Sequence, residues 1–386
     1  MKEGKIVNNI YLDHAATTPM AAEVIEAMMV AMKEDFGNPS STHLFGRESK
    51  GEINKAREVF AKSINAQISE IVFTSGGTES DNTAIIKTAE ARADEGKHLI
   101  TTNVEHEAVL KSMTYLESKG FEVTYLPVDE KGRITAKQVE EAIRPDTTLV
   151  SIMYVNNEVG NIMPIKEIGE IVADSNAFFH TDAVQAYGLL DIDVEAEQID
   201  LLSVSSHKLY GPKGVGFLYK REGVNFDSFV HGGEQENKRR AGTENTPGIV
   251  GFKKAVELAV ENKEERRSHV LELRNYTIQA LKEAGVDFSV NGDSEHTVGH
   301  ILNFRINDVP SEQLLIQLDL NGMGVSAGSA CTAGNIDPSH VLLAMFAEDA
   351  PEITETLRFS FGKDNTKEDI DEVVPVIKKA QNKKRQ

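Results

Sequence analysis

The sequence contains a single cysteine, Cys331, in a chain of 386 residues. A single cysteine excludes an intrachain disulfide and a cysteine-rich zinc site, because both require more than one thiol. Whatever chemistry Cys331 carries out is therefore that of one thiol. His296 and His300 are four residues apart but lack the glutamate of a zinc motif. We interpret both as loop residues and predict no metal site.

The sequence also lacks long apolar runs and is poor in basic residues. No stretch approaches the length of a membrane span, and residues 1–9 have no apolar signal core behind them. We therefore expect a cytoplasmic protein without a membrane partner. Its 41 Lys and Arg residues face 61 Asp and Glu residues, for a net charge of −20. This charge argues against direct nucleic-acid binding, and we interpret the basic tail at 378–386 as a solvated terminus.

Short apolar runs alternate with amphipathic stretches through the first two thirds of the chain. Strands that alternate with helices pack as a mostly parallel sheet covered on both faces, so the predicted fold class is α/β. The predicted strands are 71–74, 98–102, 121–128, 148–155, 177–181, 199–204 and 215–219. The predicted helices are 20–33, 47–64, a helix ending near 93, 108–119, 135–143 and 165–174, with Thr18 and Pro19 as the cap of the first.

After Gly242 the pattern changes to that of an α+β unit. One long helical segment is predicted at 249–284, followed by strands at 288–290, 301–306 and 356–361 and helices at 311–320, 339–347 and from 367. We expect an N-terminal segment, residues 1–20, that joins the smaller domain. The large domain is expected at 21–255 and the small domain, with the Cys331 loop, at 256–386.

Lys208 lies in a short polar loop between the apolar runs 199–204 and 215–219. A partly desolvated amine has a lowered pKa and attacks carbonyl groups, as a Schiff-base lysine does. Most lysines are solvated surface charges. The functional interpretation therefore depends on whether the chain supplies partners for Lys208.

One such partner is the turn 74–80, Thr-Ser-Gly-Gly-Thr-Glu-Ser, between a predicted strand and a predicted helix. Glycines let the backbone approach an anion, the first amides of a helix are free donors, and Thr78 adds a hydroxyl. The same residues also form plain turns and helix caps. The pattern is neither a dinucleotide fingerprint nor a Walker loop.

Polar residues also follow other predicted strands at the same edge of the sheet. A buried Asp182 needs a cationic partner, and a protonated pyridine nitrogen would serve; a helix N-cap is the alternative. Asn157 is suited to donate to a ring substituent. His106 is suited to stack on a ring or move protons, although a lone histidine is usually just a satisfied polar group. With Thr78, Gln185 and Lys208, these residues predict a pyridoxal-phosphate site.

Cys331 and Arg358 complete the candidate set. Only small residues surround Cys331 in 325–334, which suits a mobile nucleophile, although a single cysteine is most often a buried small apolar residue. Arg358, in an otherwise apolar strand, is suited to bind a carboxylate through two hydrogen bonds. The alternative for Arg358 is an internal ion pair.

These motifs resemble those of class V, fold-type I pyridoxal-phosphate enzymes, and among them the cysteine desulfurases of the NifS/IscS type. The Ser-Ala-Cys-Thr loop is similar to that branch, and the Gly-His-His-Cys pattern usual in the SufS-like branch is absent. The small departures, such as Asn237 where the family often has a basic residue, do not touch the chemistry. The matching segments are 11–18, 37–43, 74–82, His106, 156–158, 182–185, 205–208, 231–235, 240–243, 329–331 and 357–360.

The resemblance implies a role for each candidate residue. Lys208 would bond to pyridoxal 5'-phosphate, and Arg358 would hold the substrate carboxylate with help from Asn157. Cys331 would take the sulfur of L-cysteine as a persulfide and release L-alanine. The resemblance implies a phosphate site from Gly77, Thr78, Ser205 and His207, with Thr243 of the other subunit of a homodimer, and ring contacts from His106, Asp182, Asn157 and Gln185.

The resemblance also implies a fold-type I architecture, with a seven-stranded sheet in the large domain, and a sulfur acceptor. Acceptors of this branch include iron-sulfur scaffold proteins and tRNA-thiolating enzymes. The alternatives are a selenocysteine lyase, a class V aminotransferase, and a scaffold that docks acceptors with little activity of its own.

Overall fold

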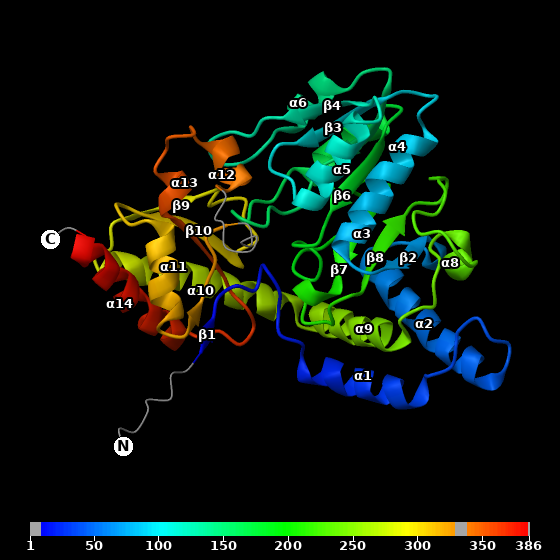
Figure 1. The fold of residues 1–386 in the computed structure, drawn as a ribbon, viewed down its shortest axis with the longest axis horizontal. Coiled ribbons are helices and arrows are strands. Elements are labelled where there is room, and N and C mark those ends of the chain that lie inside the picture. Colours follow the sequence, from blue (N-terminus) through cyan, green and yellow to red (C-terminus); the bar gives the residue numbers. More distant parts are fainter. Residues whose placement is uncertain (1–8, 329–337, 385–386) are drawn as a thin grey trace.

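The computed structural model describes residues 9–328 and 338–384, and its largest feature is a seven-stranded sheet (Figure 1). The strand order is β2-β8-β7-β6-β5-β3-β4. Neighbouring strands are parallel except at β8, which is antiparallel to both β2 and β7. The predicted mostly parallel α/β sheet is confirmed. The strands are β2 (Ile71–Thr74), β3 (His98–Thr102), β4 (Glu122–Leu126), β5 (Thr147–Ser151), β6 (Phe178–Asp182), β7 (Leu201–Ser205) and β8 (Gly216–Lys220).

Helices cover both faces of this sheet. Leu99 and Ile100 are neighbours on β3, yet they belong to different apolar clusters, because successive side chains of a strand point to opposite faces. Leu99 packs in the cluster of Ile85 and Met113, and Ile100 in the cluster of Phe60. The helices of this part are α1 (Ala22–Glu34), α2 (Leu44–Ser63), η1 (Ile68–Glu70), α3 (Gly77–Asn82), η2 (Thr83–Lys87), α4 (Thr88–Ala91), α5 (Glu107–Glu117), α6 (Ala136–Ala142), α7 (Ile165–Ala173), η3 (Ser206–Lys208), α8 (Gln235–Lys238) and α9 (Thr246–Glu261).

A smaller α+β part lies at the left of Figure 1 and has its own apolar cluster. Its antiparallel sheet has the order β12-β10-β9. The N-terminal strand β1 (Ile10–Tyr11) pairs in parallel with β11 (Met323–Gly324), and Ile10 and Leu12 are buried in the same cluster. Residues 10–12 are therefore packed against the C-terminal third of the chain. The remaining elements are α10 (Lys263–Glu283), β9 (Phe288–Asn291), β10 (Ile301–Ile306), α11 (Ser311–Asp319), α12 (His340–Met345), α13 (Glu352–Glu355), β12 (Thr356–Ser360) and α14 (Lys367–Lys384).

Two local predictions were wrong. The single helix expected at 249–284 is two helices, α9 and α10, separated at Asn262, whose side-chain amide donates to the carbonyl oxygen of Leu258. The predicted cap at Thr18 does not form, because α1 begins four residues later. The Thr18 hydroxyl instead donates to the His207 carbonyl oxygen (2.9 Å) and accepts from the Tyr210 amide (2.8 Å). It thereby fastens the N-terminal segment to the loop of Lys208.

Among the residues that the structure describes, no helix has the length and apolar character that a membrane crossing requires.

Candidate active site

A cavity of about 370 Å³ lies at the carboxyl ends of the parallel strands, beyond the last residues of β6 and β7. The structure therefore brings together residues that the sequence places as much as 343 positions apart, from Ala15 to Arg358. Its walls include Gly77, Thr78, His106, Asn157, Asp182, Gln185, Ser205, His207, Lys208 and Arg358, all of them predicted site residues.

Lys208 ends the short helix η3 that follows β7, and its half-buried side chain lines the cavity. Its Nζ atom donates to the carbonyl oxygens of Ala15 (2.5 Å) and Ala16 (2.9 Å) in the N-terminal segment. Burial, with the nearby Arg358 guanidinium, lowers the pKa of Lys208 from 10.5 to about 8. A substantial fraction of this amine is therefore neutral, and nucleophilic, at mildly alkaline pH.

The start of α3 forms a cradle at one end of the cavity. Gly76 has φ = +148°, a conformation that favours glycine. A Cβ atom on Gly77 would lie 2.8 Å from Val184 Cγ2, so only glycine fits there. The first amides of a helix have no intrahelical acceptors, and they attract an anion. The hydroxyls of Thr78 and Ser205 line the same cavity, so this end suits a phosphate.

His207 lies beside this cradle and is held in place by its Nδ1 atom, which is 3.1 Å from Thr17 Oγ1. Burial and the charges of Lys208 and Lys213 lower the pKa of His207 to about 4. The imidazole is therefore neutral and acts through hydrogen bonding rather than through charge.

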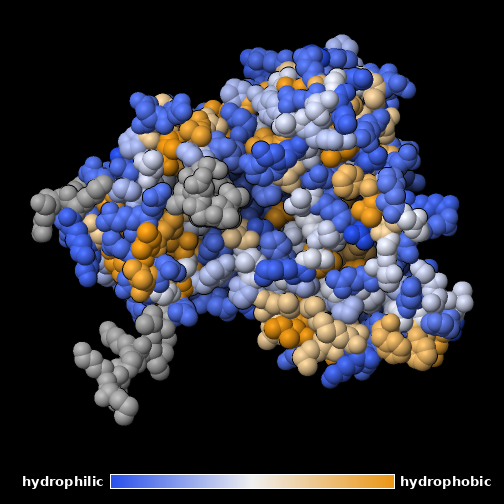
Figure 2. All heavy atoms as spheres, in the orientation of Figure 1, coloured by the Kyte–Doolittle hydropathy of each residue, from blue (hydrophilic) through white to orange (hydrophobic). Residues whose placement is uncertain are grey.

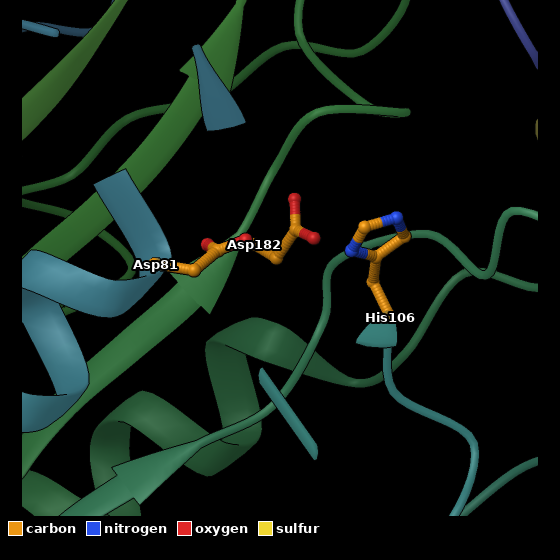
Figure 3. A group of neighbouring side chains, drawn as sticks. All are labelled: Asp81, His106 and Asp182. Carbon is orange, nitrogen blue, oxygen red and sulfur yellow. The ribbon is translucent and has the colours of Figure 1, made fainter. Parts of the chain in front are cut away.

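Asp182 lies deeper in the cavity, and its carboxyl lies between Asp81 and His106 (Figure 3). One carboxyl oxygen accepts from the Val184 amide (2.9 Å). No helix follows before β7, so the helix N-cap alternative is wrong. Burial raises the pKa of Asp182. The nearby His106 and Lys208 lower it, but the effect of burial is larger.

Asp81, on α3, is a site residue that the sequence reasoning missed. It is 1% exposed, and its Oδ1 atom has no hydrogen-bond partner among the described residues. Burial and the nearby Asp182 raise its pKa well above the usual range. The sequence feature that could have identified Asp81 is its position four residues after Gly77, because this spacing places both residues on the same face of α3.

His106 is the N-cap of α5, and its Nδ1 atom accepts from the Ala108 amide (3.1 Å). The proton of the neutral ring therefore sits on Nε2. His106, Asp81 and Asp182 each offer a ligand atom within 4.8 Å of the others. Two buried carboxyl groups beside an imidazole suit a cationic partner, which is either a metal ion or a protonated ring nitrogen.

Arg358 is 2% exposed and lines the same cavity. Its guanidinium donates to the Asn157 carbonyl oxygen and to Asp13 Oδ1, both at 2.9 Å. Arg358 therefore forms the internal ion pair, with Asp13, that the sequence analysis gave as the alternative to carboxylate binding. The Nε atom of Arg358 and the Oδ1 atom of Asn157 are buried without a partner among the described residues, which leaves binding capacity for a ligand.

Gln185 is buried, and its side-chain amide is already engaged. Its Nε2 atom donates to the Ala15 carbonyl oxygen, and its Oε1 atom faces His300 Nε2, both at 3.0 Å. His300 was predicted to be a loop residue, and it does lie in the bend directly before β10, but its side chain is only 6% exposed and lies beside Gln185 of the cavity wall. His296 is 51% exposed by its side chain and pairs with Asp293.

Among the described residues, one predicted site residue is not in this cavity. Thr243 is exposed and lies in a separate depression with Phe73 and Arg240. Arg240 forms an ion pair with Glu79 of α3 (2.8 Å). Cys331 lies outside the described residues.

The cavity thus has an amine, an anion cradle, a buried acid for a basic ring nitrogen, and a guanidinium for a carboxylate. The cradle that a Cβ atom would fill fits the anionic end of a ligand. The buried Asp81 Oδ1, which has no hydrogen bond among the described residues and lies 3.6 Å from His180 Nε2, fits a basic ring at the other end. These are the features of pyridoxal phosphate.

Comparisons with known proteins agree with this chemistry. The family model described as "Aminotransferase class-V" matches residues 10–373. The chain is 54% identical over 364 residues to "Putative cysteine desulfurase IscS 1" of Bacillus subtilis strain 168, covering 94% of this chain and 96% of that protein. It is 49% identical over 368 residues to the cysteine desulfurase IscS of Methanosarcina thermophila, covering 95% and 91%.

Solved structures give a similar result. A NifS-like protein superimposes with a TM-score of 0.90 at 38% identity, over 96% of this chain and 99% of that one. The structure of SspA in complex with cysteine superimposes with a TM-score of 0.81 at 39% identity, over 92% and 99%.

Proposed function

The chain belongs to the class-V aminotransferase family, and we propose that it is a pyridoxal-phosphate-dependent cysteine desulfurase. The observation that carries this proposal is the half-buried Lys208 amine, with its pKa lowered to about 8, in one cavity with Asp182 and Arg358. The name of the relatives and the cysteine bound in the SspA structure support cysteine as the substrate.

Pyridoxal phosphate, when bound, supplies an electron sink that weakens bonds at the carbon atoms of an attached amino acid. Gly77, Thr78, Ser205 and His207 would hold its phosphate, and Lys208 would hold its aldehyde carbon. Asp182 would pair with the ring nitrogen and keep it protonated. His106 would lie on the ring face, and Asn157 and Gln185 would contact the ring oxygen.

The substrate would be oriented by its carboxylate. Arg358 would bind this group, because a buried guanidinium with an unpartnered Nε–H recognises a carboxylate strongly. Asn157 lies beside it, and its amide oxygen has no hydrogen-bond partner among the described residues. With the amino acid fixed at both ends, Lys208 and His106 are placed to move protons.

Cys331 would receive the sulfur. The carbon–sulfur bond of L-cysteine breaks, a sulfur–sulfur bond forms at Cys331 Sγ, and the substrate carbon takes a proton. The products are L-alanine and a persulfide, so atoms and electrons balance without another oxidant. The persulfide sulfur then passes to an acceptor, an iron-sulfur scaffold protein or a tRNA-thiolating enzyme, in the cytoplasm.

The working unit is proposed to be a homodimer in which Thr243 reaches the phosphate site of the second subunit. Its exposed position outside the cavity of its own chain supports this assignment. A patch of apolar side chains also lies along α1 and the segment that leads into α2, at the lower edge of Figure 2. Its exposed members are Ile25, Met29, Val30, Met32, Phe36, Leu44 and Phe45. Such a patch is typical of an interface.

We also propose the domain limits 1–20, 21–255 and 256–386. The apolar cluster of the small part supports the assignment of the first segment, since Ile10 and Leu12 are buried with the core of the last.

The experiment that tests the function compares the wild type with Lys208→Ala and Cys331→Ser. The wild type should be yellow and should form alanine and sulfide from L-cysteine. Lys208→Ala should lose the yellow absorbance, and Cys331→Ser should keep it and release no sulfide.

Three outcomes would contradict the proposal. Full sulfide release by Cys331→Ser would remove the thiol from the mechanism. Amino-group transfer to an oxo acid that does not depend on Cys331 would indicate an aminotransferase, and activity confined to selenocysteine would indicate a selenocysteine lyase. Negligible turnover together with tight acceptor binding would indicate a scaffold.

A further inference from the structure

His300, the residue directly before β10, connects the small sheet to the wall of the active-site cavity. Its Nε2 atom lies 3.0 Å from Gln185 Oε1, and Gln185 Nε2 donates to the Ala15 carbonyl oxygen at 3.0 Å. Both side chains are buried, with 6% of His300 and 7% of Gln185 exposed. Three segments that are far apart in the sequence therefore meet in one hydrogen-bonded row.

The Ala15 carbonyl fixes the direction of every hydrogen bond in this row. A carbonyl oxygen only accepts, so the NH₂ group of Gln185 must face Ala15. The amide oxygen of Gln185 then faces His300, and the proton of His300 must sit on Nε2. Burial lowers the pKa of His300 to about 3 and keeps the ring neutral. The charged or titratable groups that act in the same direction are His14, Arg358, Lys208 and Arg266.

This arrangement decides what Gln185 presents to a ligand. Its oxygen accepts from His300 and one N–H donates to Ala15, so the second N–H has no partner among the described residues. Gln185 lines the cavity, and it therefore offers a donor rather than an acceptor. A donor suits the ionised ring oxygen of pyridoxal phosphate, which accepts hydrogen bonds.

We propose that His300 is a positioning residue that locks the Gln185 amide with an N–H directed at the cofactor ring oxygen. The inference rests on the proposed function only in requiring that pyridoxal phosphate occupy this cavity. Loss of the His300 donor leaves the buried Gln185 oxygen unpaired and frees the amide to rotate. The ring oxygen then loses a fixed donor, and its affinity for a proton rises.

The test follows the visible absorbance of the holoenzyme as a function of pH. In His300→Leu, the midpoint of the pH-dependent spectral change should rise by about half a pH unit to one pH unit. The dissociation constant of the cofactor should be about 3- to 10-fold higher than in the wild type. His300→Gln, whose amide reaches the position of Nε2, should behave like the wild type. His296→Leu, an exposed neighbour on the same segment, is the matched control and should change neither quantity.

A double-mutant cycle shows whether His300 acts through Gln185. In a Gln185→Leu background, His300→Leu should produce no further shift of the midpoint. An equal shift in both backgrounds, or no shift in His300→Leu alone, overturns the proposal. If His300→Leu does not fold, the pair His300→Asn and His300→Gln decides, since only the longer amide should restore the wild-type spectrum.

The outcomes separate this inference from the proposed function. A wild type that takes up pyridoxal phosphate but forms no alanine from cysteine overturns the proposed activity, while the spectral comparison still tests His300. A wild type that takes up no cofactor overturns both.

Discussion

The guanidinium of Arg358 forms a partly buried ion pair with Asp13, with Nη2 at 2.9 Å from Oδ1, although the two residues are 345 positions apart. The same guanidinium donates to the Asn157 carbonyl oxygen, and its Nε has no partner among the described residues. Asp13 therefore holds Arg358 in a fixed orientation without using all of its donors. An arginine held in this way is prepared to bind a carboxylate at little further cost in side-chain entropy.

Replacement of Arg358 by lysine should weaken substrate use far more than cofactor binding. Lysine keeps the charge but loses the planar fork that pairs with both Asp13 and a carboxylate. We expect kcat/KM for cysteine to fall about 10- to 100-fold, as for the loss of one or two charge-assisted hydrogen bonds. Steady-state kinetics and a cofactor titration check this. Arg305→Lys, on β10 and paired with Glu355, is the control and should retain activity. An unchanged kcat/KM in Arg358→Lys would exclude Arg358 from substrate binding.

Lys208 should capture the cofactor faster as the pH rises. Its pKa is lowered to about 8, so the reactive neutral amine increases about tenfold per pH unit below 8 and levels off above it. Stopped-flow absorbance of the cofactor-free protein mixed with pyridoxal phosphate measures this profile. The Arg358 charge contributes to the lowering, so in Arg358→Leu the midpoint should move to higher pH. A profile that still rises steeply above pH 9 in the wild type would contradict a depressed pKa.

The sequence predicted the sheet and most of the cavity for one physical reason. Parallel strands end at a common edge, so polar residues that follow several strands, such as His106, Asp182 and Lys208, must lie near one another. The apolar runs that mark these strands are short and continuous, because both faces of the sheet are covered. The positions of the strands could therefore be predicted from the sequence without any knowledge of long-range contacts.

The contacts made by the N-terminal segment and the small sheet could not be predicted from local sequence patterns. Ala15 offers only a backbone carbonyl, and no residue pattern reveals which donors it meets. His300 contacts Gln185 of the cavity wall only because the start of β10 lies beside it. The cap predicted at Thr18 failed for the same reason, since a contact with the loop of Lys208 replaced a local one.

Gly216 should be intolerant of a side chain. A Cβ atom there would lie 2.4 Å from the Val204 carbonyl oxygen and 2.8 Å from Gly76 Cα, in the backbone of the proposed phosphate cradle. Gly216→Ala should cost about 1–3 kcal/mol in the free energy of unfolding and weaken cofactor binding, because both backbones must shift. Gly51→Ala, on α2 with nothing within 4 Å of its Cβ, should be neutral or stabilising. Urea unfolding and cofactor titration measure both variants. A free energy of unfolding for Gly216→Ala equal to that of the wild type would show that the backbone of the cradle moves to accommodate the side chain at little cost.

Glu105 should make the stability of the protein depend on pH. It is fully buried, and its Oε1 atom accepts from Thr102 Oγ1 (2.7 Å) and from the Met153 amide (3.0 Å). Its Oε2 atom has no partner among the described residues. Burial raises the pKa of this carboxyl from 4.5 to about 8. The native state therefore keeps a proton that the unfolded chain releases across this range. The stabilising contribution is complete below pH 4.5 and is lost as the pH rises through about 8.

Replacement of Glu105 by glutamine should flatten this dependence, because glutamine retains the shape and hydrogen bonds of the protonated acid but does not titrate. The free energy of unfolding in urea, measured at several pH values between about 5 and 9, should fall more steeply for the wild type than for Glu105→Gln. Lys208 and the other titrating groups are common to both proteins, so the difference between the two curves isolates Glu105. Glu107→Gln, an exposed neighbour at the start of α5, should follow the wild type. Parallel curves for the wild type and Glu105→Gln would show that Glu105 ionises in the folded protein as readily as in the unfolded chain.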